Sequence, residues 1–204
     1  MKMPRVQIKY NQFLDPIFLT YFQQRFKLSL LEEIEQKEVD FIVSEYKKAW
    51  SAVEKKVLES IQDITKLSFK NALIDVHVVR RTNRSFSRPP VFDIRKNPSD
   101  FCDELIHELI HIILQQNNSI VSWGVLEWLN EKFSEETDCT RNHLYVHAIL
   151  KILYLDVLEE PKRLERNLAR SKKHSTNEYT RAWDIVDSVG EKEIIMMIKK
   201  NYEN

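Results

Sequence analysis

Residues 101–116 read FCDELIHELIHIILQQ, and residues 107–111 within them spell the motif H-E-x-x-H. Residues 97–100, just before this stretch, supply capping oxygens, a proline suited to a first helical position and an acidic group for the positive helix end. Apolar residues fill most of the remaining positions. We therefore predict a buried helix that begins near residue 97 and ends in the polar stretch 115–119.

The spacing of His107 and His111 gives the motif its chemistry. Residues four apart lie one above the other on a helix, so both imidazoles can present a nitrogen to one zinc ion. Glu108 is adjacent in sequence but rotated about the helix axis, which lets its carboxylate act on a metal-bound water without being a ligand. Zinc acidifies the water and polarises a carbonyl, and the glutamate moves the proton. We expect His107 and His111 to be zinc ligands and Glu108 to be the general base of peptide hydrolysis.

The competing interpretation of this stretch is a buried helix whose two histidines only hydrogen-bond in the core. With six histidines among 204 residues, a chance match to the motif has a probability of roughly 2%. The helix itself is predicted from its cap and its apolar spacing, independently of the motif. A metal site is therefore the favoured interpretation.

On these residues the chain resembles the zincin metallopeptidases, and in its short length their small gluzincin-like members. The resemblance covers the helix near residues 100–116 and, more weakly, a preceding strand at residues 91–94. It implies a helix-dominated α+β fold with a small mixed sheet, an active-site helix and a second ligand helix. It also implies an antiparallel edge strand that pairs with extended substrate peptides, and we assign that place to residues 91–94.

A catalytic zinc ion needs three protein ligands and a water, so the motif requires a further residue. One candidate is Glu131, in residues 130–135, which look like the Asn-Glu-x-x-x-Asp ligand helix of thermolysin-like gluzincins with a glutamate in place of the final aspartate. The other candidate is the pair His143 and His147, which share one face of an apolar helix. Paired histidines flanked by core residues are harder to explain as surface residues than Glu131, which lies beside a lysine, so we favour the pair.

The roles of the two histidines in the pair stay open. By resemblance to gluzincin-like ligand helices, the first member, His143, binds the metal and the second supports a histidine of the motif. Ala148 leaves room for close helix approach at His147, which favours the second member. If all four paired histidines bound one zinc ion, the site would be closed and structural. A core pair unrelated to metal is the competing interpretation.

The other elements are predicted from hydrophobic spacing. Apolar residues at helical spacing predict one long helix over residues 39–64, and β-branched residues predict a strand at 72–80. A second strand follows at 90–94, where two prolines favour a sheet edge. Further helices are predicted near residues 121–133, 142–158, 162–170 and 179–198. We expect residues 1–204 to form a single domain.

The composition limits the classes of function. Thirty-one Lys and Arg residues balance thirty-one Asp and Glu residues, which disfavours a general nucleic-acid binder. Only two cysteines occur, and no apolar stretch is long enough for a signal peptide or a membrane span, so we expect a cytoplasmic protein. Two glycines leave no phosphate-binding loop, which argues against ATP and NAD as cofactors. A basic cluster could still steer an acidic substrate or DNA, and it consists of Arg80, Arg81, Arg84 and Arg88.

The sequence therefore predicts a zinc metallopeptidase that acts on peptides or proteins. The competing class is a catalytically silent or occluded zincin-like module that regulates or binds a partner. A DNA-associated metalloprotease is a further alternative, and zero net charge argues against it.

Overall fold

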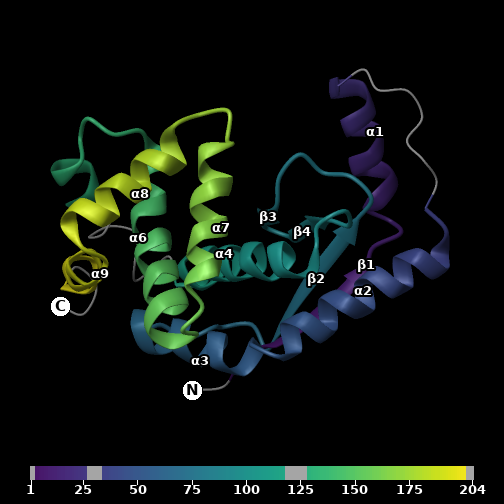
Figure 1. The fold of residues 1–204 in the computed structure, drawn as a ribbon, viewed down its shortest axis with the longest axis horizontal. Helices are drawn as coiled ribbons and strands as arrows, with labels where there is room; N and C mark the ends of the chain where they lie inside the picture. Colours follow the sequence, from purple (N-terminus) through teal and green to yellow (C-terminus); the bar gives the residue numbers. More distant parts are fainter. Residues whose placement is uncertain (1–2, 27–33, 118–127, 201–204) are drawn as a thin grey trace. The chain divides into compact units, whose positions relative to one another are not determined.

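The computed structural model describes residues 3–26, 34–117 and 128–200. The chain divides into two compact units, which we call the sheet unit (residues 2–55 and 71–112) and the helical unit (residues 56–70 and 113–204). Helices predominate, and the described strands form one small mixed sheet (Figure 1). The predicted helix-dominated α+β class is confirmed.

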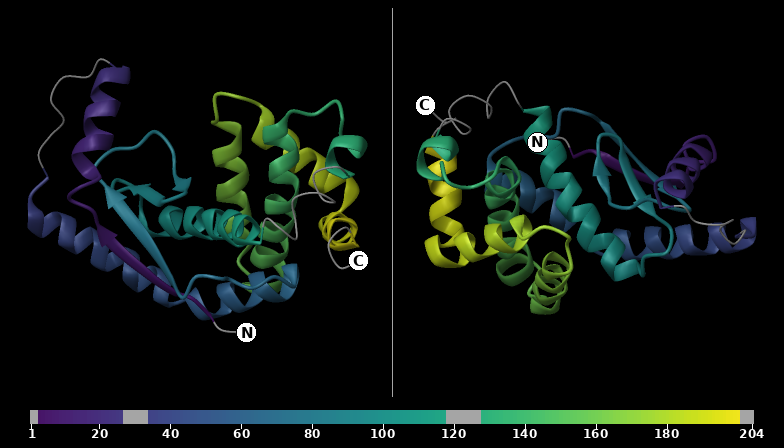
Figure 2. Two further views of the ribbon diagram at one scale, coloured as in Figure 1. Left: turned by 180° about the vertical axis from the view of Figure 1, so that it is seen from behind. Right: turned by 90° about the horizontal axis from the view of Figure 1, so that it is seen from above.

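The sheet unit is built on four strands in the order β1-β2-β4-β3. β1 (Arg5–Tyr10) and β2 (Leu73–Val79) are parallel and lie side by side (Figure 2). β4 (Pro90–Asp93) is parallel to β2, and β3 (Phe86–Ser87) is antiparallel to β4. The strand predicted at residues 72–80 is therefore confirmed as β2.

The prediction that residues 90–94 form an edge strand is wrong. β4 is present, but it pairs with β2 on one side and with β3 on the other. Pro90 is tolerated in this internal strand because it is the first residue, where a missing N–H interrupts little of the ladder. Among the described strands, the short β3 forms the antiparallel edge on this side of the sheet.

The structure contains two N-terminal elements that were not predicted from the sequence, β1 and α1 (Asp15–Phe26). α1 is anchored to the strand end by Asp15, whose side chain is buried. Its carboxylate accepts hydrogen bonds from the backbone N–H of Arg80 at 2.5 Å and from the Arg80 Nε at 2.7 Å. One arginine of the basic cluster thus holds a helix in place.

Aromatic side chains join two helices to the sheet. α2 (Gln36–Ser51) contributes Tyr46, whose ring stacks on Phe101 of α4 (Pro98–Gln116) with the ring centroids 4.1 Å apart. Phe101 in turn meets Phe92 of β4 edge-on at 5.2 Å. The Tyr46 hydroxyl donates to the backbone oxygen of Ile94 at 2.7 Å. The first part of α4 is therefore fixed against the sheet, in a position set by buried aromatic contacts.

The predicted start of α4 is confirmed. Asn97 caps the helix, since its side-chain oxygen accepts a hydrogen bond from the Asp100 N–H at 2.9 Å. The end is confirmed as well, because the helix stops at Gln116, inside the predicted polar stretch.

The single helix predicted over residues 39–64 is in fact two helices, α2 and α3 (Glu54–Thr65). The Val53 N–H donates to the Trp50 oxygen at 3.0 Å, three residues back, and this tighter turn ends α2. Apolar spacing continues through the turn, so the spacing alone could not reveal the break.

The helical unit contains α6 (Asp138–Ile152), which continues as the π-helical turn η1 (Leu153–Val157), and then α7 (Pro161–Lys172), α8 (Glu178–Val189) and α9 (Glu191–Lys200). α6 packs against both α8 and α9, and α7 packs against α8. None of the helices among the described residues is both long and apolar enough to cross a membrane.

Two predicted C-terminal helices differ from the observed ones. The helix predicted over 179–198 is interrupted at Gly190, whose φ of 95° separates α8 from α9 and suits a residue without a side chain. Of the helix predicted over 121–133, residues 128–132 are helical and residues 121–127 lie outside the described ranges.

Candidate metal centre

The two histidines of the motif lie one above the other on α4, within the sheet unit. Their Nε2 atoms are 3.1 Å apart, and both side chains are half-buried. Two nitrogens bound to one tetrahedral zinc ion at about 2.0–2.1 Å would lie about 3.3 Å apart. His107 and His111 therefore fit two positions of a zinc site without a change of helix geometry.

The local sequence explains why these rings are presented in this way. α4 is buried on most sides, and its fully buried residues around the motif are Leu105, Ile106, Leu109 and Ile110. The half-buried positions 104, 107 and 111 follow one another at helical spacing. A hydrophobic helix thus presents a single polar stripe, which carries both imidazoles.

Glu108 lies beside this stripe and is almost fully buried, with 9% of its surface exposed. Burial raises the pKa of Glu108 to about 7, and the nearby charge of Glu104 adds to the increase. The charge of Arg84 and a hydrogen bond from Ser87 act in the opposite direction on this pKa. A carboxyl that titrates near neutral pH is suited to accept and then release a proton.

The segment around β3 supplies a layer of serines that holds the glutamates of α4. Ser87 donates to Glu108, and Ser85 donates to Glu104, one helical turn earlier. Lys96 also binds Glu104, with its Nζ 2.8 Å from the carboxylate. These serines could not be identified from the sequence, because two serines in a polar segment between strands carry no chemical signal until the helix facing them is known.

His143, on α6 of the helical unit, is buried and is oriented by its own helix. Its Nδ1 lies 2.7 Å from the backbone oxygen of Cys139, so this nitrogen carries the proton and donates to that oxygen. Burial lowers the pKa of His143 and favours the neutral ring. In this tautomer the lone pair is on Nε2, which is the arrangement of a metal-binding histidine whose other nitrogen is fixed by a carbonyl.

His147 has a different environment from His143. Its side chain is fully buried, and its ring stacks on Trp183 of α8 with the centroids 4.2 Å apart and the planes 10° apart. Such a parallel aromatic contact is typical of a core side chain. The structure thus distinguishes two histidines that the sequence leaves equivalent.

The remaining candidates have less to offer a metal. Glu131, the other candidate for a third ligand, is exposed to solvent.

In the basic cluster, two arginines lie over aromatic rings: Arg81 over the ring of Phe22 at 5.6 Å, and Arg84 over the ring of Phe86 at 5.0 Å. These cations are held against aromatic rings of the sheet unit, which accounts for part of the cluster without a nucleic acid.

Within the sheet unit, the described residues therefore bring together two imidazole donors and one carboxyl with a pKa near neutrality. Within the helical unit, α6 carries both His143 and His147, with their ring centroids 5.6 Å apart. Comparisons with protein-family models, with curated proteins and with solved structures find no match to this chain.

Proposed function

We propose that this protein is a zinc-dependent metallopeptidase in which His107 and His111 bind the metal and Glu108 is the general base. The observation that carries the proposal is the 3.1 Å separation of the two Nε2 atoms, with Glu108 buried beside them. The donor set fits zinc, which prefers imidazole nitrogen in catalytic sites.

We propose His143 as the third ligand, so that three histidine ring nitrogens would hold the metal. The hydrogen bond of its Nδ1 to the Cys139 oxygen supports this role, because it leaves Nε2 as the donor nitrogen. His147 supports α6 through its contact with Trp183 instead. Three histidines keep a fourth position for water, as a catalytic site requires.

When bound, zinc supplies an acidified water and a polarised carbonyl. Glu108 accepts a proton from the attacking water at a carboxylate oxygen and passes it to the departing amine of the cleaved bond. Ser87 holds the carboxylate in one orientation and moderates the rise in its pKa. Burial keeps solvent from competing for the same carboxylate.

The proposed substrates are extended segments of peptides or proteins. β3 has a described partner on one side only, and its Ser87 contacts Glu108, so a substrate strand added to β3 would run close to the base. We also propose a cytoplasmic location, which is supported by Cys102 and Cys139, neither of which forms a disulfide.

The test has two measurements. Elemental analysis measures bound zinc, and a fluorescein-labelled, denatured protein serves as the substrate for measuring hydrolysis. We expect about one zinc ion per chain in the unmodified protein and in Glu108→Gln, with hydrolysis reduced at least a hundredfold in the variant. The double variant His107→Ala/His111→Ala should lose both zinc and hydrolysis. His77→Ala is the matched control, because this histidine lies on β2, where its Nδ1 contacts the side chain of Asn11, and it should keep both.

The outcomes separate the alternatives. A protein that stays free of metal when zinc is supplied would contradict the proposal at its root. Zinc bound by the two histidines without hydrolysis, before and after limited proteolysis, would show a silent zincin-like module that acts by recognition.

A further inference from the structure

β1 forms the edge of the sheet opposite to β3, and one side of it has no strand partner among the described residues. The N–H of Arg5 donates to the Ala72 oxygen at 2.9 Å, and the N–H of Asn11 donates to the Val78 oxygen at 3.0 Å. Backbone groups alternate in direction along a strand, so the odd-numbered residues face β2 and the even-numbered ones face outward. The peptide groups of Val6 and Ile8 therefore point away from β2, toward the outer edge of the sheet.

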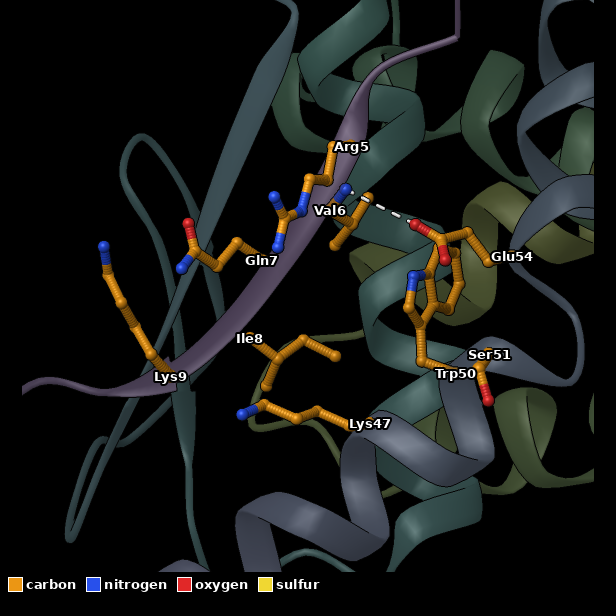
Figure 3. A pocket seen from close by; sticks show the side chains of 9 residues that line it. All are labelled: Arg5, Val6, Gln7, Ile8, Lys9, Lys47, Trp50, Ser51 and Glu54. Carbon is orange, nitrogen blue, oxygen red and sulfur yellow. Dashed lines mark hydrogen bonds between the residues drawn. The ribbon is translucent and has the colours of Figure 1, made fainter.

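A groove of about 350 Å³ follows this outer edge, between β1 and the end of α2 (Figure 3). Ile8 and Trp50 form an apolar part of its lining, and both are buried. Arg5 and Lys47 line it as well, and both are exposed to solvent. The groove thus combines an apolar floor with cationic sides, which is the chemistry that holds an acidic side chain and its aliphatic stem.

The cations at the groove are not equally available. Lys9 already forms an ion pair with Asp75, with the Nζ and the carboxylate oxygen 2.7 Å apart. Arg5 and Lys47 form no ion pair with another described residue. These two side chains are therefore the ones that an incoming carboxylate would meet.

Trp50 provides a second, independent observation. Its side chain is 2% exposed, and its indole Nε1 is a buried donor with no hydrogen-bond acceptor among the described residues. Figure 3 shows this nitrogen on the side of the ring that faces β1. Buried donors are nearly always satisfied in folded proteins, so an acceptor is expected to arrive with a bound group.

Glu54 indicates what kind of group binds here. Its Oε1 lies 3.4 Å from the outward N–H of Val6, a long hydrogen bond that places a carboxylate oxygen at the open edge (Figure 3). A strand partner would replace this contact with a backbone carbonyl at a shorter distance.

We propose that the outer edge of β1 binds an extended acidic segment of a partner protein, which adds as a strand and places acidic side chains beside Arg5 and beside Lys47. Main-chain hydrogen bonds to Val6 and Ile8 supply affinity, and the cationic groove supplies the preference for acidic side chains. This site lies at the opposite edge of the sheet from Ser87 of β3, whose hydroxyl binds Glu108, so it serves recognition and is separate from the proposed hydrolysis.

The experiment measures fluorescence anisotropy of a labelled eight-residue peptide in which valine and glutamate alternate. The full chain is used with Glu108→Gln, so that hydrolysis does not consume the probe. We expect saturable binding that weakens at least tenfold in Lys47→Glu and in Arg5→Glu. Lys48→Glu is the matched control, because Lys48 is a neighbouring exposed lysine of α2 that does not line the groove, and binding should not change.

Two further measurements address the backbone contacts and the role of Glu54. A peptide with proline at alternate positions cannot donate along the edge, and it should not bind. Glu54→Gln removes the competing charge next to the Val6 N–H, and the acidic peptide should bind several-fold more tightly.

Three results would overturn the proposal. The first is equal binding of a peptide in which lysine replaces each glutamate, and the second is equal loss of affinity in Lys48→Glu and Lys47→Glu. The third is a dimer in sedimentation that dissociates in Arg5→Glu, which would assign the edge to a second copy of the chain. Each readout is binding or mass, so failure here is distinguishable from failure of the metallopeptidase proposal.

Discussion

The ring of His147 lies parallel to the indole of Trp183, with the centroids 4.2 Å apart, whereas His143, one turn earlier, directs its Nδ1 to the Cys139 oxygen at 2.7 Å. The two histidines of α6 thus have different structural roles. One is packed as an aromatic core residue, and the other is oriented by a backbone acceptor as metal-binding histidines are.

Replacement of each histidine by phenylalanine tests this difference. In His147→Phe the ring contact with Trp183 is kept, and we expect about one zinc ion per chain, as in the unmodified protein. In His143→Phe the donor nitrogen is lost, and the metal affinity should fall at least a hundredfold because one of three protein ligands is missing. Zinc titration against a chelator of known affinity measures both. Loss of zinc in His147→Phe alone would reverse the assignment.

The hydrogen bond from Ser87 should set the pH at which Glu108 becomes active. The bond lowers the pKa of Glu108, so Ser87→Ala should raise that pKa and move the acidic limb of kcat/KM to higher pH. A hydrogen bond to a charged group contributes on the order of 1.5 kcal/mol, which corresponds to a shift of about one pH unit. Ser85→Ala is the control, because Ser85 binds Glu104 and should move the limb less. Equal limbs in both variants would contradict the role of Ser87.

The buried carboxyl of Glu108 should also make the metal-free protein less stable at higher pH. Its pKa is raised from 4.5 to about 7 in the folded chain, so the folded state holds the proton more tightly than the unfolded state. This contribution to stability is complete below pH 4.5 and is lost as the pH rises through 7. The loss amounts to at most about 3 kcal/mol.

Urea unfolding in the presence of a chelator, at pH 5 and at pH 8, measures this effect. The fall in the free energy of unfolding between the two pH values should be smaller in Glu108→Gln, which has no proton to lose. Asp93, whose pKa is raised to about 6 mainly by burial, contributes in the same direction and remains in both proteins. An identical fall in both proteins would show that Glu108 does not titrate in this range.

The part of the fold that could be predicted carries strong local signals. α4 has a capping residue, a long apolar run and a polar end, and its observed bounds, Pro98–Gln116, agree with the prediction. β2 is rich in β-branched residues, and it too lies where it is predicted. Both pairs of histidines spaced four residues apart also lie on helices as predicted, one pair on α4 and the other on α6.

The missed features depend on contacts that are distant in the sequence. Residues 5–10 alternate between polar and apolar in the pattern of a strand, but the stretch is short, and its place in the sheet comes from pairing with residues 73–78. β4 is internal because Phe86 and Ser87 pair with it as an antiparallel strand. The intervening Arg88 and Pro89 do not predict this pairing. Ser87, which donates to Glu108, belongs to the same hairpin. The sequence could therefore predict the proposed general base but not the serine that binds it.

The contact between Asp15 and Arg80 provides a test of the N-terminal elements. Asp15 is 1% exposed and accepts two hydrogen bonds from Arg80, one from the backbone and one from the side chain. Asp15→Ala leaves a backbone N–H and a guanidinium without their acceptor. The Arg80 side chain is 27% exposed, so water can solvate part of its charge, and we expect a loss of about 2 kcal/mol in unfolding free energy rather than the larger cost of a fully buried ion pair. Asp75→Ala is the control. The side chains of Asp75 and its partner Lys9 are both exposed as in a surface ion pair, so this substitution should lower the unfolding free energy by less than about 1 kcal/mol.

Urea unfolding compares the two variants, and hydrogen exchange should show earlier opening of α1 in Asp15→Ala alone. Equal stability of the two variants would mean that α1 is held mainly by its aromatic contacts, such as that between Phe18 and Phe86, and not by the buried carboxylate.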